Sequence, residues 1–302
     1  MEGIPATAVA EVSNVVKAYG RKSVVNDVSF GVSPGEIFGL IGPNGAGKTT
    51  TIRMMMDIVK PDAGQISILG EQLAESTKDR IGYLPEERGL YKKLTVTETL
   101  DYLAELKGKQ PAEGRAHKLL QRVGMLAHKD KKIEELSRGM SQLIQFLSTI
   151  IHDPQLIILD EPFSGLDPVN TQILKEIVLE LRSQGRAIIF STHQMNQVEE
   201  LCDRILMINH GRAVLYGQLA DIKNKYRNNS VLVEAEGDLG ELAGVTGRQQ
   251  QGKSIELMLD GKTEPQAVLK QIVINGNAVK RFEVTTPSLN QIFIQVAGES
   301  SE

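Results

Sequence analysis

The stretch that decides the fold is Gly42-Pro43-Asn44-Gly45-Ala46-Gly47-Lys48-Thr49, which fits the phosphate-binding loop pattern G-x-x-x-x-G-K-[ST]. An apolar strand-like run, Ile37–Ile41, precedes it, and a helix-like run, Thr50–Val59, follows it. Glycines let consecutive backbone N–H groups turn toward a phosphate, and the following helix offers its positive end. Lys48 adds a point charge for the phosphates, and Thr49 offers a hydroxyl to Mg²⁺. Because both flanking elements are present, the pattern predicts a triphosphate site rather than an ordinary glycine-rich turn.

Two adjacent carboxylates end a second buried run, Leu156-Ile157-Ile158-Leu159-Asp160-Glu161. Ligands bind at the carboxyl ends of strands in a parallel sheet, so two acids at that position indicate a site. Beside a phosphate loop, Asp160 is predicted to hold the metal through water or a hydroxyl. Glu161 is predicted to polarise an attacking water. Adjacent acids without such a loop would indicate little, because acids are common on protein surfaces.

Strands and helices alternate along the first two thirds of the chain. Short strands are expected over residues 8–41, and the run 156–159 is followed by an amphipathic helix at 173–181 and a strand at 187–190. This alternation predicts βαβ units around a parallel sheet, and therefore an α/β fold. Residues 209–211, Asn-His-Gly, separate two further strand-like runs, which predicts a hairpin at the end of this domain.

A mainly helical insertion is predicted at about residues 95–151 of this domain, which is expected to span residues 8–220. The insertion begins with Thr95-x-x-Glu98, a capping box in which each side chain bonds the backbone N–H of the other residue. Leucines then recur at helical spacing.

A second, small α+β domain is expected at residues 231–298, after a polar and charged run at 223–230. Three strand-like runs and one helical run, Pro265–Ile274, precede a final helix. Ser288-x-x-Gln291 caps that helix, whose apolar residues share one face.

The composition disfavours several classes of protein. The 302 residues carry a net charge of −4 and give a pI of about 5.9, so no bulk basic surface indicates a nucleic-acid partner. No run of about 18 apolar residues is free of charge, and the N-terminus lacks the layout of a signal peptide. The chain is therefore not expected to cross a membrane by itself. The single cysteine, Cys202, excludes an intramolecular disulfide, suits a reducing cytosol and is expected to be a buried hydrophobe.

The segment Leu136-Ser137-Arg138-Gly139-Met140-Ser141-Gln142 resembles the signature sequence of the ATP-binding cassette (ABC) family, usually written LSGGQ. A serine at a helix start, with glycine close behind, makes an anion-binding helix terminus. The resemblance covers residues 8 to about 220. It implies a P-loop NTPase cassette with a mixed sheet core, an antiparallel β part and a helical subdomain. Arg138 and Met140 replace the usual glycine and glutamine, as in the drug- and sodium-efflux branch of the family.

The resemblance gives roles to further residues, in the order in which the family has them. Tyr19 is similar to the aromatic residue that stacks on adenine, although it also fits a half-buried strand residue. Asp167 matches the D-loop, which crosses the dimer interface, and His193 is similar to the histidine that contacts the γ-phosphate. Glu86 stands where the family usually has glutamine, so its charge is expected to change metal affinity. The segment 87–91 also resembles the efflux branch.

Motifs and resemblance together predict one site for ATP and Mg²⁺. The predicted catalytic residues are Glu161, His193 and Lys48. The predicted metal-binding residues are Thr49, Glu86 and Asp160. The predicted ATP-binding residues are Tyr19, Gly42, Pro43, Asn44, Gly45, Ala46, Gly47, Lys48, Thr49, Thr50, Ser137, Gly139 and Asp167.

The function that the resemblance implies is ATP hydrolysis that powers an efflux transporter for a drug-like compound or sodium. In the family, the signature contacts ATP held by the partner subunit. The resemblance therefore implies a head-to-tail nucleotide-sandwich dimer, bound to a separate transmembrane permease at the cytoplasmic face of the cell membrane. Two alternatives stay open: an importer ATPase whose C-terminal domain binds a regulatory ligand, and a soluble ABC ATPase acting on ribosomes or DNA. Proteins of the latter kind usually carry two cassettes or a long coiled-coil insertion, and this chain has neither.

Overall fold

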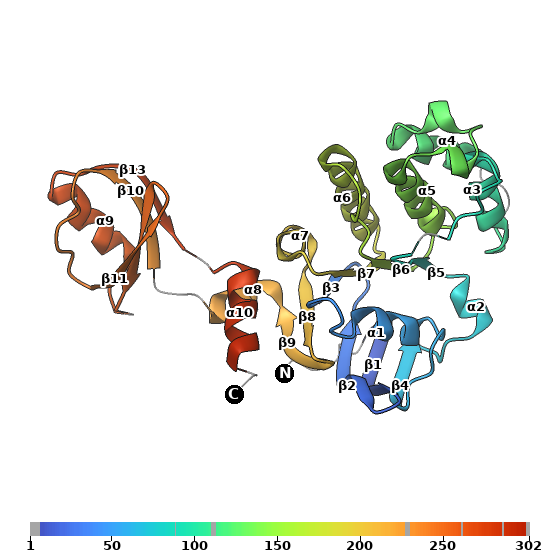
Figure 1. Ribbon diagram of the computed structural model, residues 1–302, viewed down its shortest axis with the longest axis horizontal. Coiled ribbons are helices and arrows are strands. Elements are labelled where there is room, and N and C mark those ends of the chain that lie inside the picture. Colours follow the sequence, from blue (N-terminus) through green and yellow to red (C-terminus); the bar gives the residue numbers. More distant parts are fainter. Residues whose placement is uncertain are drawn as a thin grey trace. The chain divides into compact units, whose positions relative to one another are not determined.

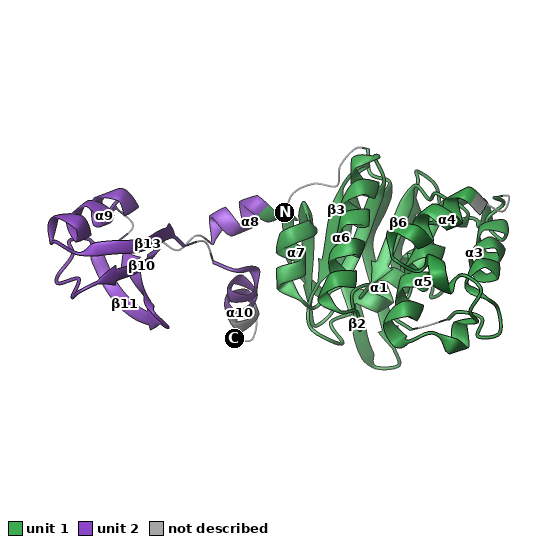
Figure 2. Cartoon of the chain, turned by 90° about the horizontal axis from the view of Figure 1, so that it is seen from above, with its two compact units in different colours: residues 1–219 green, residues 220–302 purple. Residues whose placement is uncertain are grey.

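The computed structural model describes residues 7–87, 89–109, 113–226, 230–260, 262–285 and 287–299. The chain divides into two compact units, residues 1–219 and 220–302, which Figure 2 colours separately. Arg88, which belongs to the segment that resembles the efflux branch, lies outside the described residues.

A six-stranded mixed sheet forms the centre of the first unit (Figure 1). Its order is β5-β6-β7-β3-β8-β9, and the strands are β3 Ile37–Ile41, β5 Ile81–Leu84, β6 Leu156–Asp160, β7 Ala187–Thr192, β8 Arg204–Asn209 and β9 Arg212–Gln218. The first five strands of this order are parallel, and β9 pairs antiparallel with β8 in the predicted hairpin. Every residue of β3, β6 and β7 is buried, as expected for parallel strands covered on both faces.

An antiparallel sheet and helix α1 (Lys48–Met55) cover one face of the mixed sheet (Figure 1). The antiparallel sheet has the order β2-β1-β4, from β1 Ala10–Tyr19, β2 Lys22–Val32 and β4 Ala63–Ile68. Ile52 of α1 shares one buried cluster with Phe30 of β2 and Phe38 of β3, and the two phenylalanine rings stack at 5.2 Å between centroids. Burying these side chains removes apolar surface from water, which fixes α1 against both sheets.

Helix α1 is shorter than the sequence pattern predicts. It begins at Lys48, directly after the glycine loop, and ends at Met55, although the helix-like run continues to Val59. Asp57 has a φ of 57°, a left-handed conformation that cannot continue a right-handed helix. Lys60-Pro61 then leads into β4.

The other face of the mixed sheet carries helices α6 (Pro168–Ser183) and α7 (Met195–Leu201) (Figure 1). Asp167 caps α6 by accepting the backbone N–H of Asn170 at 2.9 Å. Cys202, just after α7, is buried with its Sγ close to Gly39, and burial raises the pKa of its thiol. The expectation of a buried, unreactive cysteine is confirmed.

Helices predominate between β5 and β6. They are α3 Val96–Glu105, α4 Glu113–Arg122 and α5 Arg138–Ile150, with short 3₁₀ turns at Leu126–His128 and Ile133–Glu135. A four-residue helix, α2 Glu75–Lys78, lies before β5. The predicted capping box opens α3: Thr95 N–H donates to Glu98 Oε2 at 2.8 Å, and Glu98 N–H donates to Thr95 Oγ1 at 3.2 Å.

The second unit contains a four-stranded antiparallel sheet with the order β11-β12-β10-β13. Helix α8, Leu219–Lys225, starts on the last residue of the first unit. The further elements of the second unit are β10 Ser230–Glu236, β11 Val245–Gln251, β12 Ser254–Leu259, α9 Pro265–Ile274, β13 Ala278–Val284 and α10 Leu289–Glu299. Val268 and Ile272 of α9 share a buried cluster with Val231 and Leu257 of the sheet. The predicted combination of an α/β cassette and a small α+β part is confirmed.

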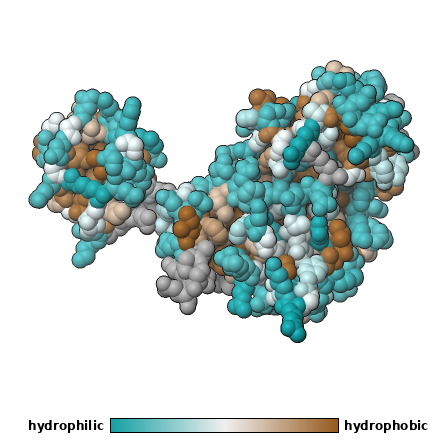
Figure 3. Space-filling view, in the orientation of Figure 1, coloured by the Kyte–Doolittle hydropathy of each residue, from teal (hydrophilic) through white to brown (hydrophobic). Residues whose placement is uncertain are grey.

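No helix among the described residues is long and apolar enough to cross a membrane. The apolar run at residues 143–151 falls largely within α5, which has 13 residues. On the face that Figure 3 shows, hydrophobic side chains form small groups separated by hydrophilic ones.

Candidate active site

The register of the parallel strands brings four loops to one edge of the mixed sheet. Ile41 of β3 lies beside Thr192 of β7, and Ser191 of β7 lies beside Asp160 of β6. Leu84, the last residue of β5, pairs with Leu159 of β6. The residues that follow these strands therefore emerge together, at the carboxyl edge where α/β sheets bind ligands.

The glycine loop lies where the neighbouring backbone leaves no room for a side chain. Gly42 has a φ of 148°, and a Cβ atom there would lie 2.1 Å from the carbonyl oxygen of Ile208. Gly47 has a φ of 113°, and its Cβ would lie 2.6 Å from the carbonyl oxygen of Val24. Both positions require glycine for conformation and for space. The loop thus bends tightly into the start of α1, and the N-terminal end of a helix favours an anion.

Lys48 is buried at the first turn of α1, with its ammonium group inside the loop. Its Nζ donates to the carbonyl oxygens of Gly42, at 2.8 Å, and Pro43, at 3.2 Å. Burial lowers the pKa of Lys48, and the carboxylates of Glu161, Asp160 and Glu86 raise it in part. One cation therefore faces three acids, an arrangement that suits a polyanion accompanied by a metal ion.

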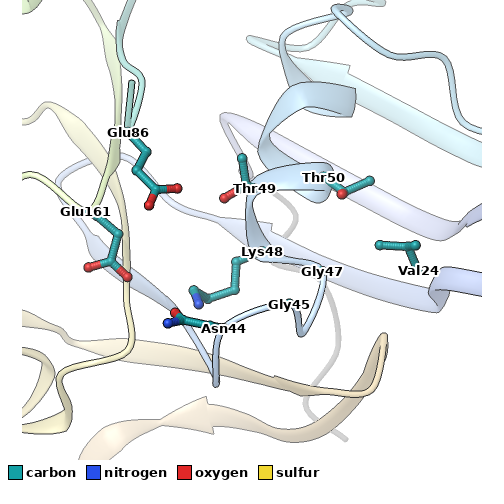
Figure 4. A pocket seen from close by; sticks show the side chains of 9 residues that line it. All are labelled: Val24, Asn44, Gly45, Gly47, Lys48, Thr49, Thr50, Glu86 and Glu161. Carbon is teal, nitrogen blue, oxygen red and sulfur yellow. The ribbon is translucent and has the colours of Figure 1, made fainter. Parts of the chain in front are cut away.

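A pocket of about 250 Å³ lies between the loop and these acids. Figure 4 shows the carboxylates of Glu86 and Glu161 pointing into the same space as the ammonium of Lys48 and the hydroxyl of Thr49. The full lining is Val24, Asn44, Gly45, Gly47, Lys48, Thr49, Thr50, Glu86 and Glu161. The structure thus brings together six of the nine predicted loop residues and two of the predicted acids.

Glu161 is held in place from β7. Its Oε1 accepts the backbone N–H of His193 at 3.1 Å and lies 2.7 Å from Nδ1 of the same residue. Its Oε2 accepts the hydroxyl of Thr192 at 3.3 Å. The backbone of Glu161 has a φ of 50°, an uncommon conformation for a residue with a side chain, and such conformations cluster at functional sites.

Asp160 presents an oxygen that fits a metal ion. Its Oδ1 accepts the hydroxyl of Ser191, and no hydrogen-bond partner reaches its buried Oδ2 within the part of the chain that the structure describes. Burial raises the pKa of Asp160, and the hydroxyls of Ser191 and Thr49 lower it in part. A buried oxygen without a partner, close to a threonine hydroxyl, is a donor set that suits Mg²⁺.

Seven of the predicted ATP-binding residues lie outside this pocket lining: three belong to the glycine loop itself, and the other four are Tyr19, Ser137, Gly139 and Asp167. Tyr19 ends β1, is half exposed, and has Lys17 Nζ 5.7 Å from its ring centroid. Ser137 caps α5, with Met140 N–H donating to its Oγ at 3.3 Å, and a Cβ on Gly139 would lie 3.7 Å from the Gly165 carbonyl oxygen. Asp167 is an exposed helix cap. The roles of these residues in ATP binding stay predictions.

Several residues around the site were missed by sequence reasoning. Ser191, Thr192 and Gln197 bond Asp160, Glu161 or each other. Val24 enters the pocket from β2 because its carbonyl packs on Gly47. Ser191 and Thr192 directly precede His193 at a strand end, a position that could have marked them, whereas nothing in the sequence marks Val24 or Gln197.

The fold and the site define a P-loop nucleotide-binding ATPase with a helical insertion between the phosphate loop and the acidic strand. The model of the family described as ABC transporter matches residues 25–164. A second model, described as ATP-binding protein DrrA1-3-like, C-terminal domain, matches residues 217–297.

Full-length relatives agree with these models. The chain is 44% identical over 264 residues to an uncharacterized ABC transporter ATP-binding protein of Alkalihalophilus pseudofirmus, which covers 86% of this chain and 98% of the relative. It is 33% identical over 297 residues to Nod factor export ATP-binding protein I of Rhizobium etli, covering 96% and 93% of the two chains. The chain therefore belongs to the family of ABC transporter ATP-binding proteins, which are ATPases.

A solved structure supports the same assignment. The ATP-binding subunit of an ABC transporter superposes with a TM-score of 0.69 at 35% identity, covering 72% of this chain and 93% of the other. Membership of this family means that the chain binds ATP, and that it is a subunit which works with a membrane permease.

Proposed function

We propose that this chain hydrolyses ATP at the pocket around Lys48 and thereby powers an ABC exporter. The observation that carries this proposal is the convergence of Lys48, Thr49 and Glu161 on one pocket, with the glycine loop on one side and the acidic strand end on the other. Phosphoryl transfer depends on positioning and charge neutralisation, and these groups supply both.

Each group has a defined part in the proposed reaction. Lys48 and the loop N–H groups bind the β- and γ-phosphates, so that Lys48 exchanges its carbonyl partners for phosphate oxygens. Glu161 accepts a proton from the attacking water, and His193, held against Glu161, contacts the γ-phosphate. Thr49, Asp160 and Glu86 would hold Mg²⁺, which supplies charge neutralisation on the phosphates when bound.

The proposed active unit is a head-to-tail dimer. Ser137 is exposed at the start of α5 and does not line the pocket of its own chain. A helix N-terminus with a serine cap favours an anion. In the proposed dimer, Ser137 and Gly139 of one subunit meet the γ-phosphate held by the other, and Asp167 lies at the interface. ATP then stabilises the closed dimer, and its hydrolysis releases it.

The proposed direction of transport is export. The relative from Rhizobium etli is named for export, and the signature variants at Arg138 and Met140 resemble the drug- and sodium-efflux branch. We propose a drug-like compound or sodium as cargo and the cytoplasmic face of the cell membrane as the location. Residues 8–220 would form the ATPase domain, with a helical subdomain at 95–151, and residues 231–298 an accessory domain.

Purification from membranes tests this proposal. A tagged full-length chain, extracted in detergent, should bring down a multi-spanning membrane protein in stoichiometric amount. Inside-out vesicles that contain both should take up the cargo with ATP, and vesicles carrying Lys48→Ala should not. Uptake by right-side-out vesicles alone would contradict export, and purification with ribosomes instead of a membrane protein would contradict a transport role.

A further inference from the structure

A second set of polar contacts lies behind the pair of Glu161 and His193. Thr192 is fully buried at the end of β7, and Gln197 on α7 is 7% exposed. Neither belongs to the pocket lining. A buried polar side chain loses its hydration, so it is stable only where hydrogen bonds compensate. The hydrogen bonds of these two residues therefore indicate what they stabilise.

The hydroxyl of Thr192 stands at the centre of these contacts. Its Oγ1 lies 3.3 Å from Oε2 of Glu161 and 3.3 Å from Oε1 of Gln197, and either oxygen can accept its proton. Oγ1 itself accepts the backbone N–H of Gln194 at 3.1 Å. A hydroxyl has one proton and two lone pairs, so with the Gln194 N–H on one lone pair its proton points to one of these two oxygens.

Gln197 holds the turn after β7 on both sides of His193. Its Oε1 faces Thr192, which precedes the histidine, and its Nε2 donates to Oε1 of Gln194, which follows it, at 2.9 Å. The Gln197 backbone N–H also donates to the Gln194 carbonyl oxygen, at 3.2 Å. The His193 side chain is 47% exposed and rests against Glu161. Its position therefore depends on the backbone of this turn.

We propose that Gln197 is a positioning residue, which acts through Thr192 to hold the Glu161 carboxylate and the His193 ring in their reactive orientation. This inference rests on the proposed role of Glu161 as the base. The essential feature of Gln197 is the oxygen acceptor beside Thr192. Without that acceptor the hydroxyl and the turn gain freedom, and a displaced base slows hydrolysis while ATP binding at the loop is retained.

Steady-state ATP hydrolysis by the full-length chain tests the proposal. Gln197→Leu removes the acceptor at similar volume, so we expect kcat to fall about tenfold while KM for ATP changes less than about twofold. Gln197→Glu keeps an oxygen beside Thr192, and the exposed amide of Gln194 can turn to donate to it. This variant should keep at least about half of the wild-type kcat, since the bond to Thr192 remains. Asn196→Leu changes an exposed neighbour on the same helix and serves as the matched control.

Variants of Thr192 provide a second, independent measurement. Thr192→Val should lower kcat like Gln197→Leu, and Thr192→Ser should recover most of the loss because the hydroxyl returns. Since both changes interrupt one chain of contacts, the double variant of Thr192→Val and Gln197→Leu should be no slower than the slower single variant. If thermal unfolding shows that Gln197→Leu does not fold, the proposal is tested by comparing the kcat of Thr192→Val with that of Thr192→Ser.

Three outcomes would overturn the inference: a kcat for Gln197→Leu equal to that of the wild type, equal loss in Gln197→Leu and Gln197→Glu, or equal kcat in Thr192→Val and Thr192→Ser. Failure of the proposed function looks different. If Glu161→Gln hydrolyses ATP like the wild type, Glu161 is not the base. If Glu161→Gln is inactive but Gln197→Leu is not slowed, only the positioning role of Gln197 is wrong.

Discussion

Oε1 of Glu161 lies 2.7 Å from Nδ1 of His193, and the same oxygen accepts the backbone N–H of His193. The two residues are 32 positions apart in the sequence and follow the neighbouring strands β6 and β7. Glu161, whose carboxylate would accept a proton from the attacking water, is thus held in place by His193, which would contact the γ-phosphate. A group held in this way needs no reorganisation during the reaction.

Replacing His193 should therefore affect turnover more than binding. For His193→Ala we expect kcat to fall by about two to three orders of magnitude, as for the loss of one preorganised group at a charged transition state. The dissociation constant for a fluorescent ATP analogue should stay close to that of the wild type. A variant that loses ATP affinity and keeps its turnover at saturating ATP would contradict this role.

Two glycines of the loop should respond differently to alanine. Gly47→Ala places a Cβ 2.6 Å from the Val24 carbonyl oxygen, so α1 or β2 must shift and ATP affinity should fall at least about tenfold. Gly45 also has a positive φ, of 76°, but a Cβ there meets no atom within 4 Å. Gly45→Ala should accordingly bind ATP more tightly than Gly47→Ala in calorimetric titration. The reverse order would contradict the loop geometry.

The dimer proposal predicts complementation between two inactive variants. Lys48→Ala removes the positive charge that the phosphate loop offers to ATP. Ser137→Asp keeps a good helix cap but places a negative charge opposite the γ-phosphate. In a mixed dimer, one of the two sites combines the intact loop of the Ser137→Asp subunit with the intact signature of the Lys48→Ala subunit. Hydrolysis should therefore appear in the mixture and in neither parent alone. A mixture as inactive as its parents would mean that Ser137 does not act on the partner's ATP.

His152 predicts a dependence of stability on pH. Its ring is buried after α5 and lies 3.1 Å, through Nε2, from the Ile81 carbonyl oxygen; burial lowers its pKa. At pH values below the unfolded pKa of about 6.5, the unfolded chain binds a proton that the folded chain does not. The free energy of unfolding should thus fall as the pH drops below about 6.5, until the lowered folded pKa is reached.

Denaturant unfolding at pH 5.5 to 8 measures this effect, with pH values chosen around the ordinary histidine pKa of about 6.5. In His152→Gln the free energy of unfolding should fall less than in the wild type as the pH drops below about 6.5. His117 is exposed on α4, so His117→Gln serves as the control and should leave the profile unchanged. An acid-side slope that is the same for His152→Gln and the wild type would contradict this assignment.

The sequence predicts the core of the site because its motifs have fixed neighbours. A phosphate loop needs a strand before it and a helix after it, and a buried strand that ends in Asp160 and Glu161 must reach the same sheet edge. Helix α9 of the second unit, Pro265–Ile274, has the predicted bounds because a proline starts it and an apolar pattern marks its length.

Other features depend on contacts that no local pattern records. Strand β11, Val245–Gln251, carries three consecutive glutamines, and its pairing with β12 decides its conformation. Strand β4 contains Gly64, whose φ of 86° is set by the close approach of Asn14. Gln197 falls within the amphipathic pattern of α7, and only the folded turn shows that it bonds Thr192.

The central claim, that ATP is hydrolysed at this pocket with Glu161 as the base, is tested most directly by Glu161→Gln. The amide keeps the size of the side chain but cannot accept the proton of the attacking water. Phosphate release should fall to the background of Lys48→Ala, while ATP still binds and the variant accumulates as an ATP-bound dimer in gel filtration with light scattering. Wild-type rates of phosphate release by Glu161→Gln would contradict the account.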